Sequence, residues 1–498
     1  MKILILASEM DGIVKTGGLA DFSRFLPKAL IERGHEVRVI LPAYRQVLLT
    51  PPAAPAGGHD GIPADRPRSQ PLSFHLNHSD RYGCLVHHLR LDDIPVRLVE
   101  HHDFFSRGGI YGEGDDAYPD NALRFAFLCK AALEQCISEA WMPDIVHCND
   151  WQTALAPYYL KEHFIYHPGF QRTRSLLTIH NGEYQWKTDS RWIHPLGILP
   201  QRFTPELMEE YGLLNLLKCG IMMADAVNTV SPGYRQELLQ PETSHHLWRY
   251  FSKRIDRFRG ILNGCDYTFW DPQTDPLIPH HYSMEDMSGK ALCKAALQSR
   301  MRLPQESEAP LLGLVSRLTQ QKGFDYLIPA LERLLYEDAP LQLALLGSGN
   351  PDYGSRLHHL ERRYPHKMSF VNGYDNGLSH LIEAGSDFFM MPSLFEPCGL
   401  NQLYSQAYGA LPVIRQTGGL TDTVVGLDPG HGNAGEATGI GFTHPDSNGC
   451  HHGLGRAVSL YREHPSLYRR MQQRAMGQRF TWGESAKQYE TLYQTLLD

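Results

Sequence analysis

The chain opens with the apolar run Lys2-Ile3-Leu4-Ile5-Leu6-Ala7, and a little further on it reads Thr16-Gly17-Gly18-Leu19-Ala20-Asp21. A short apolar run bounded by polar residues is typical of a buried strand in a parallel sheet. Residues 20–33 carry apolar side chains at helical spacing and end at Gly34, which predicts a helix. Strand, glycine loop and helix in this order are the building unit of an open α/β sheet.

The same alternation of strands and helices continues through both halves of the chain. Further strands are predicted in the first half at 36–41, 144–147, 175–179 and 226–230 and in the second half at 310–315, 341–346, 387–391 and 411–414. A chain of 498 residues is too long for one ordinary core, so we expect two such sheets in two domains. The Gly, Asn and Pro residues of 260–272 suit the connection between them.

Two further segments stand apart from this alternation. Residues 50–71 are rich in Pro, Gly and Ala and are predicted to be a mobile surface excursion. The last residues, 481–497, form an amphipathic pattern that predicts a helix. This helix could pack on either domain through its apolar positions, which are Trp482, Tyr489, Leu492 and Tyr493.

Composition excludes several classes of function. Hydrophobic residues make up 42% of the chain and charged residues 20%, as in an ordinary soluble globular protein. The net charge of −8 gives no reason to expect nucleic acid or an anionic membrane as partner. The nine cysteines occur singly, without a CxxC pair, which argues against disulfides and a zinc site and favours a reducing compartment. With an N-terminal apolar run too short for a signal peptide, we expect a cytoplasmic protein. We expect no cofactor and no metal.

One short string occurs in both halves of the chain. Thr417-Gly418-Gly419-Leu420-Thr421-Asp422 repeats the pattern of residues 16–21 and also leads from a predicted strand into a helix. Adjacent glycines let the backbone approach a ligand closely, and a helix N-terminus offers free N–H groups and partial positive charge. Each copy alone could be merely a tight turn. The presence of two favours a pair of anion-binding loops, for which a diphosphate is the natural ligand.

Charged side chains lie where a sugar diphosphate would need them. Lys15 precedes the first glycine loop, and Arg317 and Lys322 follow the first strand of the second half. Such cations could clamp phosphate oxygens, or they could simply be solvated. Glu396, in the string Ser393-Leu-Phe-Glu-Pro-Cys-Gly399, could accept hydrogen bonds from sugar hydroxyls or could only complement a helix dipole.

Two histidines follow neighbouring strands of the first half. They occur in His147-Cys-Asn-Asp150-Trp151 and in His180-Asn181. A single histidine is more often structural than catalytic, but two at neighbouring strand ends raise the odds of a functional site.

Together these strings resemble the bacterial glycogen synthase and plant starch synthase family. The resemblance covers nearly the whole chain, and its motifs are Lys15-Thr-Gly-Gly-Leu-Ala-Asp21, His180-Asn181, Ile261-Leu-Asn-Gly264, Ser316-Arg-Leu-Thr-Gln-Gln-Lys-Gly323, Phe395-Glu-Pro-Cys-Gly-Leu400 and Thr417-Gly-Gly-Leu420. It implies an α/β protein of GT-B type, with two Rossmann-like domains facing across a deep cleft. The implied domains are an acceptor-side domain at 1–259, a nucleotide-sugar domain at 260–479 and a C-terminal helix, 480–498, that returns to the first domain.

The resemblance also implies an activity and a set of site residues. The expected reaction is a retaining transfer of glucose, without metal, from ADP-glucose to an α-1,4-glucan such as glycogen. The residues matched to catalysis are Lys15, His180, Arg317, Lys322 and Glu396. The residues matched to donor binding are Lys15, Gly17, Gly18, Asp21, Asn263, Arg317, Lys322, Tyr374, Glu396, Cys398, Gly399, Thr417, Gly418 and Gly419, and those on the acceptor side are Asp150 and Trp151.

The match departs from the family in one loop. Glu183 and Trp186 stand where the family usually has smaller residues after its His-Asn pair. Tyr404 stands where many related retaining transferases carry a second glutamate, and this is taken as usual for this branch. Three alternatives stay open: a UDP-glucose-using enzyme, an enzyme acting on a small acceptor such as fructose or glycerate, and a catalytically silent sugar-nucleotide or glucan-binding regulator. A pyridoxal-dependent phosphorylase is disfavoured, because no cofactor-lysine motif lies near the C-terminal end.

Overall fold

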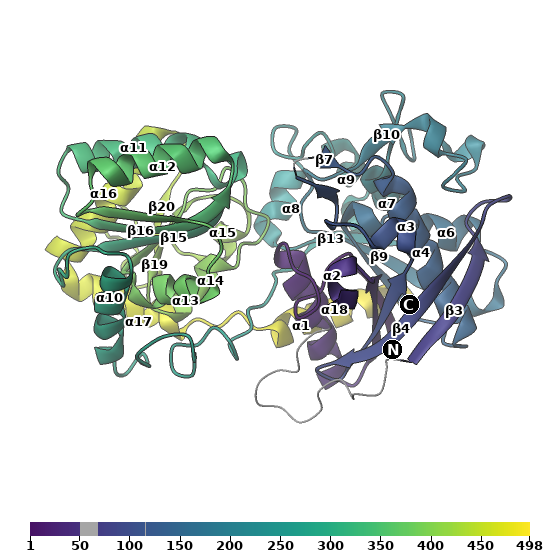
Figure 1. The fold of residues 1–498 in the computed structure, drawn as a ribbon, viewed down its shortest axis with the longest axis horizontal. Coiled ribbons are helices and arrows are strands. Elements are labelled where there is room, and N and C mark those ends of the chain that lie inside the picture. Colours follow the sequence, from purple (N-terminus) through teal and green to yellow (C-terminus); the bar gives the residue numbers. More distant parts are fainter. Residues whose placement is uncertain (50–67, 115) are drawn as a thin grey trace. The chain divides into compact units, whose positions relative to one another are not determined.

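A computed structural model describes residues 1–49, 68–114 and 116–498. The chain divides into two compact units (Figure 1). The first unit comprises Met1–Val230, Arg235–Asn263 and Trp482–Asp498, and the second comprises Ser231–Tyr234 and Gly264–Thr481. The chain therefore changes unit a few residues after the predicted divisions at 259/260 and 479/480, and the short segment Ser231–Tyr234 is counted with the second unit.

The first unit is built on a nine-stranded sheet. Its order is β14 (Phe258–Gly260), β13 (Ala226–Thr229), β9 (Arg174–Ile179), β8 (Ile145–Asn149), β1 (Lys2–Leu6), β2 (Glu36–Pro42), β5 (Ile94–Glu100), β4 (Arg81–Leu91) and β3 (Arg68–His75). The strands from β14 to β5 pair in parallel, whereas β4 and β3 are antiparallel additions.

The sequence analysis missed this antiparallel pair. Buried and exposed positions alternate in the first half of β4, so it lacks the continuous apolar run by which the parallel strands were found. Residues 68–71 of the predicted surface excursion belong to β3, so that part of the prediction is wrong. The remainder of the excursion, 50–67, lies outside the described residues.

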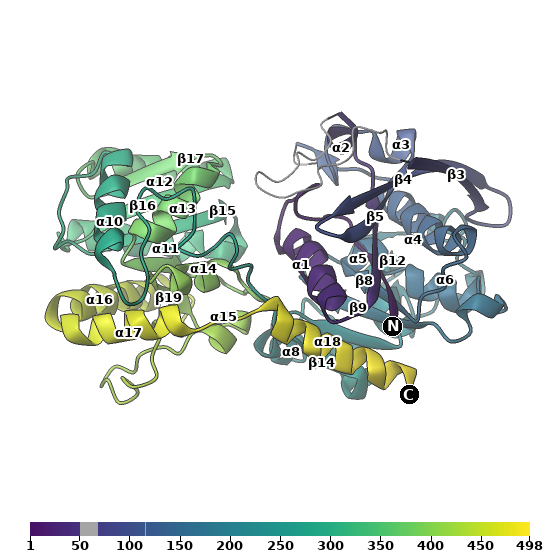
Figure 2. The same ribbon diagram turned by 90° about the horizontal axis from the view of Figure 1, so that it is seen from below.

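The C-terminal helix α18 (Trp482–Leu497) belongs to the first unit and packs against α1 (Gly18–Glu32), as Figure 2 shows. The rings of Phe22 and Trp482 lie 5.9 Å apart, edge to face. Tyr489 and Tyr493 are fully buried. The Tyr489 hydroxyl accepts a hydrogen bond of 2.8 Å from the amide of Asn228 in β13. The amphipathic pattern left open which domain this helix would cover, the family resemblance implied the first, and these contacts assign it to the first.

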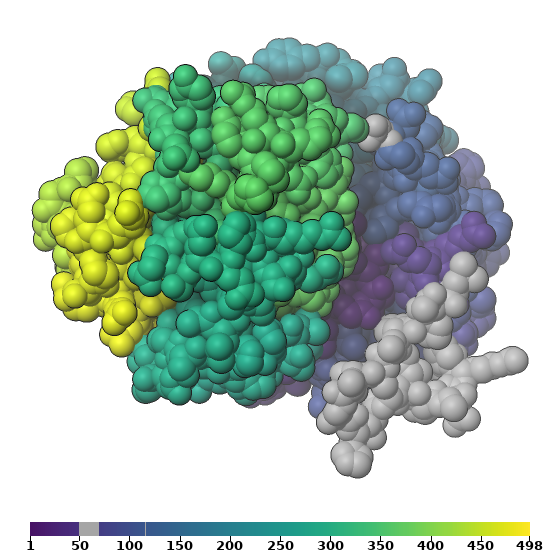
Figure 3. Space-filling model, turned by 60° about the vertical axis from the view of Figure 1, so that its left-hand side comes forward, coloured from purple at the N-terminus to yellow at the C-terminus, as the bar shows by residue number. Residues whose placement is uncertain are grey.

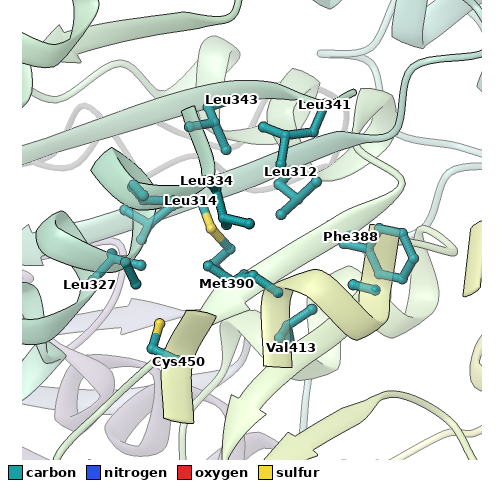
Figure 4. Packing of buried hydrophobic residues seen from close by; sticks show 14 of the residues in the cluster. Leu312, Leu314, Leu327, Leu334, Leu341, Leu343, Phe388, Met390, Val413 and Cys450 are labelled. Carbon is teal, nitrogen blue, oxygen red and sulfur yellow. The ribbon is translucent and has the colours of Figure 1, made fainter. Parts of the chain in front are cut away.

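The second unit is built on a six-stranded parallel sheet. Its order is β17 (Met368–Asn372), β16 (Gln342–Gly349), β15 (Leu311–Leu318), β18 (Phe388–Met391), β19 (Leu411–Arg415) and β20 (Ile440–Phe442). Helices cover both faces, so successive residues of β15 enter two different cores. Leu312 and Leu314 pack with Leu327 and Leu334 of α11 (Phe324–Tyr336), as Figure 4 shows. Leu311 joins the opposite core.

Helices near the end of the chain complete this unit. α16 (Ser447–Glu463) packs against α11 and against β19 and β20, and α17 (Pro465–Gly477) packs against α16. In the space-filling view their yellow-green and yellow residues lie beside the teal and green part of the same unit (Figure 3). Within the described residues, no helix is long and apolar enough to cross a membrane.

Two strands of the second unit are longer than predicted. β15 extends to Leu318 and β16 to Gly349, with Ser316 paired to Gly347 and Arg317 to Ser348. Ser316 and Arg317 therefore lie in the strand, although the sequence analysis placed them in a loop beyond it. Backbone pairing explains the difference, because a ladder can continue where the apolar pattern has ended.

Candidate active site

The acidic loop of the second unit runs from the end of β18 to α14 (Asn401–Ala407) and carries Glu396. Glu396 is buried, with 6% of its surface exposed. Its Oε2 accepts hydrogen bonds from Lys322 Nζ at 2.5 Å and from Ser393 Oγ at 2.9 Å. Lys322 and Glu396, predicted from separate strings, thus form one ion pair.

The Lys322 turn is bonded directly to the acidic loop. The Leu394 N–H donates to the Gln321 carbonyl at 2.8 Å. Gly323, which follows Lys322, has a φ of +75°, and a Cβ there would lie 1.8 Å from the Pro392 carbonyl oxygen. Only glycine fits this position, both for its backbone conformation and for its space. The close approach holds the Lys322 ammonium beside the Glu396 carboxylate.

The second glycine string also packs against the acidic loop. It forms the start of α15 (Gly418–Thr423), and the Gly419 N–H donates to the Glu396 carbonyl at 3.0 Å. A Cβ on Gly419 would lie 2.5 Å from the Cα of Cys398. This pair of glycines therefore has a packing reason of its own. A close approach of ligand to Gly418 stays a prediction.

Other predicted donor-site residues differ in their surroundings. Arg317 and Tyr374 are exposed, Tyr374 to 86%. Asn263, the last residue of the first unit before the chain enters the second, is buried. Its Oδ1 has no hydrogen-bond partner among the residues that the structure describes.

In the first unit, Lys15 lies between two carboxylates. Its Nζ is 2.6 Å from Asp21 Oδ1 and 3.2 Å from Asp11 Oδ1. Burial alone would lower the pKa of Lys15, but the two aspartates raise it, so the side chain stays charged. Glu9 anchors the same loop, because its Oε2 accepts the Thr16 N–H at 2.5 Å. A Cβ on Gly17, the next residue, would meet nothing within 4 Å.

Asp150 and His180 meet where β8 and β9 end. Asp150 has a φ of +55°, and its Oδ1 accepts the His180 N–H at 2.7 Å. The Asn149 amide donates to the Leu6 carbonyl, so its Oδ1 is the acceptor for the His180 Nε2–H at 2.9 Å. Burial lowers the pKa of His180 to about 3 and raises that of Asp150 to about 7. The imidazole is therefore neutral and cannot act as a cation here.

The loop that departs from the family pattern carries Trp186, which stacks on Trp151. Their ring centroids are 4.8 Å apart and the planes differ by 16°. Glu183 is exposed. This stack lies beside Asp150 in sequence and adds a second aromatic ring to the predicted acceptor side.

His147 does not belong to this group. It lies inside β8 rather than after it, and its Nδ1 is 2.7 Å from the Tyr493 hydroxyl of α18. His147 is fully buried, and burial lowers its pKa to about 3. The functional interpretation of this histidine is wrong, because α18 covers it.

Several residues that support the site were not found from the sequence. Glu9 carries no motif of its own, and its carboxylate acts through a contact that the fold creates. Asn149 and Ser393 lie in the strings singled out for Asp150 and Glu396, which is the one signal that could have found them. The described residues contain no group of three or more His, Cys, Asp or Glu side chains that could hold a metal ion.

Comparison with known proteins defines the class first. Residues 2–253 match the family model of the starch synthase catalytic domain, and residues 298–438 match that of the group 1 glycosyl transferases. The sucrose-phosphate synthase from Thermosynechococcus elongatus shares the fold alone, with a TM-score of 0.59 at 17% identity over 99% of this chain and 98% of that one. The two sheets and these matches define a glycosyltransferase of the GT-B fold class.

Two closer relatives define the family. A glycogen synthase from Aeromonas hydrophila is 42% identical over 507 aligned residues, which cover 100% of this chain and 98% of the relative. The catalytic domain of starch synthase IV from Arabidopsis thaliana, solved with ADP and acarbose, has a TM-score of 0.87 at 32% identity, covering 99% of both chains. The chain belongs to the glycogen synthase and starch synthase family. This confirms the resemblance and the α/β fold class predicted from the sequence.

Proposed function

We propose that this glycosyltransferase moves glucose from ADP-glucose to the 4-hydroxyl at the non-reducing end of an α-1,4-glucan, with retention at the anomeric carbon. The observation that carries the proposal is the pair formed by Lys322 and Glu396, held by a glycine turn and a glycine helix start. ADP as the nucleotide is supported by the Arabidopsis starch synthase IV structure, which contains ADP. All nine cysteines lie in the described residues, are buried and form no disulfide, which suits a reducing cytoplasm.

In the second unit, Lys322 and Arg317 are proposed to bind the diphosphate. Lys322 supplies a point charge and Arg317 a planar fork of donors for phosphate oxygens. Glu396, already oriented by Ser393, would accept hydrogen bonds from the glucosyl hydroxyls. The exposed Tyr374 is proposed to contact the nucleoside, while the backbone of Cys398, Gly399 and Thr417–Gly419 shapes the donor site.

In the first unit, Lys15 and the loop of Gly17 and Gly18 are proposed to contact the diphosphate as well. Since Asp21 and Asp11 hold the Lys15 ammonium, a bound diphosphate would share this cation with them. Asp21 is proposed to lie near the nucleoside.

The sugar and the acceptor are assigned to other groups of the same unit. His180, as a neutral imidazole, and Asn263, through its unpartnered Oδ1, are proposed to bind the glucosyl group. Asp150 and Trp151 are proposed to bind the acceptor glucan.

The proposed chemistry breaks the bond between the anomeric carbon and the diphosphate oxygen, and the bonding electrons leave with ADP. The cations stabilise this developing charge, a contribution typically worth several kcal/mol in enzymes. The glucan 4-hydroxyl attacks the oxocarbenium-like carbon from the face that the diphosphate leaves. Its proton passes to a departing phosphate oxygen, so ADP and a glucan one residue longer are the products.

The test is nucleotide release by the purified protein in EDTA, with ADP-glucose or UDP-glucose and with or without glycogen. Glycogen-dependent release of ADP supports the proposal. Faster release of UDP would overturn the donor assignment alone. No release from either donor would overturn the glucan synthase assignment and favour a small acceptor or a silent binding protein.

A further inference from the structure

The segment through which the chain enters the second unit packs against the helix that follows Glu396. Trp270 in this segment stacks on Tyr404 of α14, with ring centroids 3.9 Å apart and planes inclined by 4°. On its other side Trp270 stacks on His380 of α13 (Asn376–Gly385), also at 3.9 Å, with an inclination of 11°. The indole is thus held between two rings that are themselves buried, Tyr404 to 8% and His380 to 4% exposed.

A buried carboxylate fixes one outer ring of this sandwich, that of His380. Asp275, only 1% exposed, lies 2.7 Å from His380 Nδ1, and it accepts the hydroxyl of Tyr408, the residue after α14, at 2.5 Å. One carboxylate of the entering segment therefore ties α13 to the end of α14. A buried network in which each member is bonded holds one arrangement of its elements.

The same segment also contacts the start of α14. Cys265, Leu403 and Tyr404 form a small buried cluster, with Leu400 and Phe480 packed against it. Leu400 directly follows the Glu396-Pro-Cys-Gly399 turn, and the Cys265 N–H donates to the Phe480 carbonyl at 2.7 Å. Both ends of the second unit, where the chain enters and where it leaves, thus meet at the helix start beside Glu396.

We propose that Trp270 is a positioning residue for the transfer reaction. Its stack on Tyr404 fixes the first turn of α14 and, through Leu400 and Gly399, the direction of the Glu396 carboxylate and its distance from Lys322. In this proposal Trp270 acts through Tyr404 and α14, on which it stacks, rather than on the substrate itself. The expected change in kcat rests on the proposed function. The expected effect of Trp270 on the order of the acidic loop does not.

Kinetics of Trp270→Leu, Trp270→Phe and Phe269→Leu test the proposal. Leu removes the stack and keeps an apolar side chain, and Phe keeps a ring. Phe269, the neighbouring aromatic residue, is 51% exposed and serves as the matched control. Because a displacement of about 1 Å at a reacting group can cost about a hundredfold in rate, we expect Trp270→Leu to lower kcat at least about tenfold. The KM for glycogen should change less than about threefold, Trp270→Phe should recover most of the rate, and Phe269→Leu should match the parent protein.

Hydrogen exchange over residues 393–404 gives a second readout that needs no activity. We expect faster exchange in Trp270→Leu than in the parent protein or in Phe269→Leu. The amides of β17, an edge strand of the same sheet, should stay protected in all three proteins. A folded Trp270→Leu with parent kcat and parent exchange overturns the proposal. If Trp270→Leu does not fold, Tyr404→Leu replaces it as the variant without the stack, and Trp270→Phe remains the variant that keeps a ring. A kcat equal to that of the parent protein in both variants overturns the proposal. A parent protein without turnover contradicts the proposed function, and the exchange comparison then decides the positioning alone.

Discussion

At the scale of single residues, the ion pair between Lys322 and Glu396 is the feature on which the proposed chemistry depends. The lysine is 21% exposed at its side chain and the glutamate 8%, so solvent reaches the cation more easily than the acid. A diphosphate could therefore approach Lys322 while Glu396 keeps its hydrogen bond from Ser393.

Replacing either partner should stop turnover without unfolding the protein. We expect Lys322→Ala and Glu396→Gln each to lower kcat by about a hundredfold or more, which is the usual cost of losing one group that stabilises transition-state charge. Arg333→Ala removes an exposed ion pair with Glu337 in the same unit and should leave kcat unchanged. Glycogen-dependent ADP release measures all three, and near-parent turnover in either site variant would remove that residue from the mechanism.

The Asp150 carboxyl should make stability depend on pH. Burial raises its pKa to about 7, although backbone N–H groups of His180 and Asn181 favour the charged form. In the unfolded chain such a carboxyl ionises near pH 4. Between about pH 4 and pH 7 the folded state therefore holds a proton that the unfolded state has released. The free energy of unfolding contributed by this group falls as pH rises, by about 1.4 kcal/mol per pH unit.

Asp150→Asn should lack this contribution, so the stability difference between variant and parent should change in the variant's favour from about pH 5 to pH 7. Urea unfolding at several pH values measures the difference. Asp93→Asn, at a side chain that is 90% exposed, is the control and should show no such trend. A difference for Asp150→Asn that is constant with pH would show that this carboxyl ionises normally in the folded protein.

At the scale of elements, the two glycine strings have the same sequence pattern and different surroundings. Gly17, the first glycine of its string, has open space where a Cβ would be, whereas Gly419, the second glycine of the other string, touches the acidic loop. The string alone predicts a glycine turn before a helix. Only the packing shows that the second copy also lets its loop pack closely against the acidic loop.

This contrast gives a paired prediction. Gly17→Ala should leave the free energy of unfolding within about 0.5 kcal/mol of the parent value, yet lower turnover if a ligand approaches this loop closely. Gly419→Ala should lower turnover and should also lower the free energy of unfolding by about 1–3 kcal/mol, because the new Cβ overlaps the Cys398 backbone. Urea unfolding and ADP release separate the two effects. Parent-like turnover in Gly17→Ala would mean that the first string is only a turn.

The elements also show where prediction from sequence stopped. Buried parallel strands such as β1 and β18 were found because both of their faces are apolar. The hairpin of β3 and β4 was missed, since exposed positions interrupt the buried ones in both strands and pairing, not composition, defines it. Within the site, Lys322 and Glu396 were found from their strings. Asn149 was not, because its hydrogen bond to the distant His180 leaves no local pattern. Ser393 stood in the Glu396 string, but the string does not show that its hydroxyl donates to Glu396.

At the scale of the whole molecule, the chain forms two units with separate cores, and ADP should affect them differently. Each unit has its own sheet, so we expect two thermal unfolding transitions. Saturating ADP, at about a hundred times its Kd, should stabilise the nucleotide-binding unit by about 2.7 kcal/mol and raise one transition more than the other.

A variant of α18 identifies which transition belongs to which unit. Tyr489→Ala opens a cavity in the first unit and should lower its transition alone, whereas Thr491→Ala, at an exposed position of the same helix, should not. Scanning calorimetry with and without ADP measures the shifts. An ADP shift confined to the transition that Tyr489→Ala lowers would contradict the assignment of nucleotide binding to the second unit.

The sequence by itself determined two α/β sheets, the strings that carry charged and glycine residues, and membership of a glycosyltransferase family. These are encoded locally, since apolar periodicity, glycine turns and charged strings are read within a few neighbouring residues. The tertiary structure alone decided that α18 covers His147 in the first unit and that Trp270 lies between His380 and Tyr404. It also decided that Lys322 pairs with Glu396. Such contacts join residues far apart in the chain, and only the packing of whole elements against one another brings them within a few ångströms.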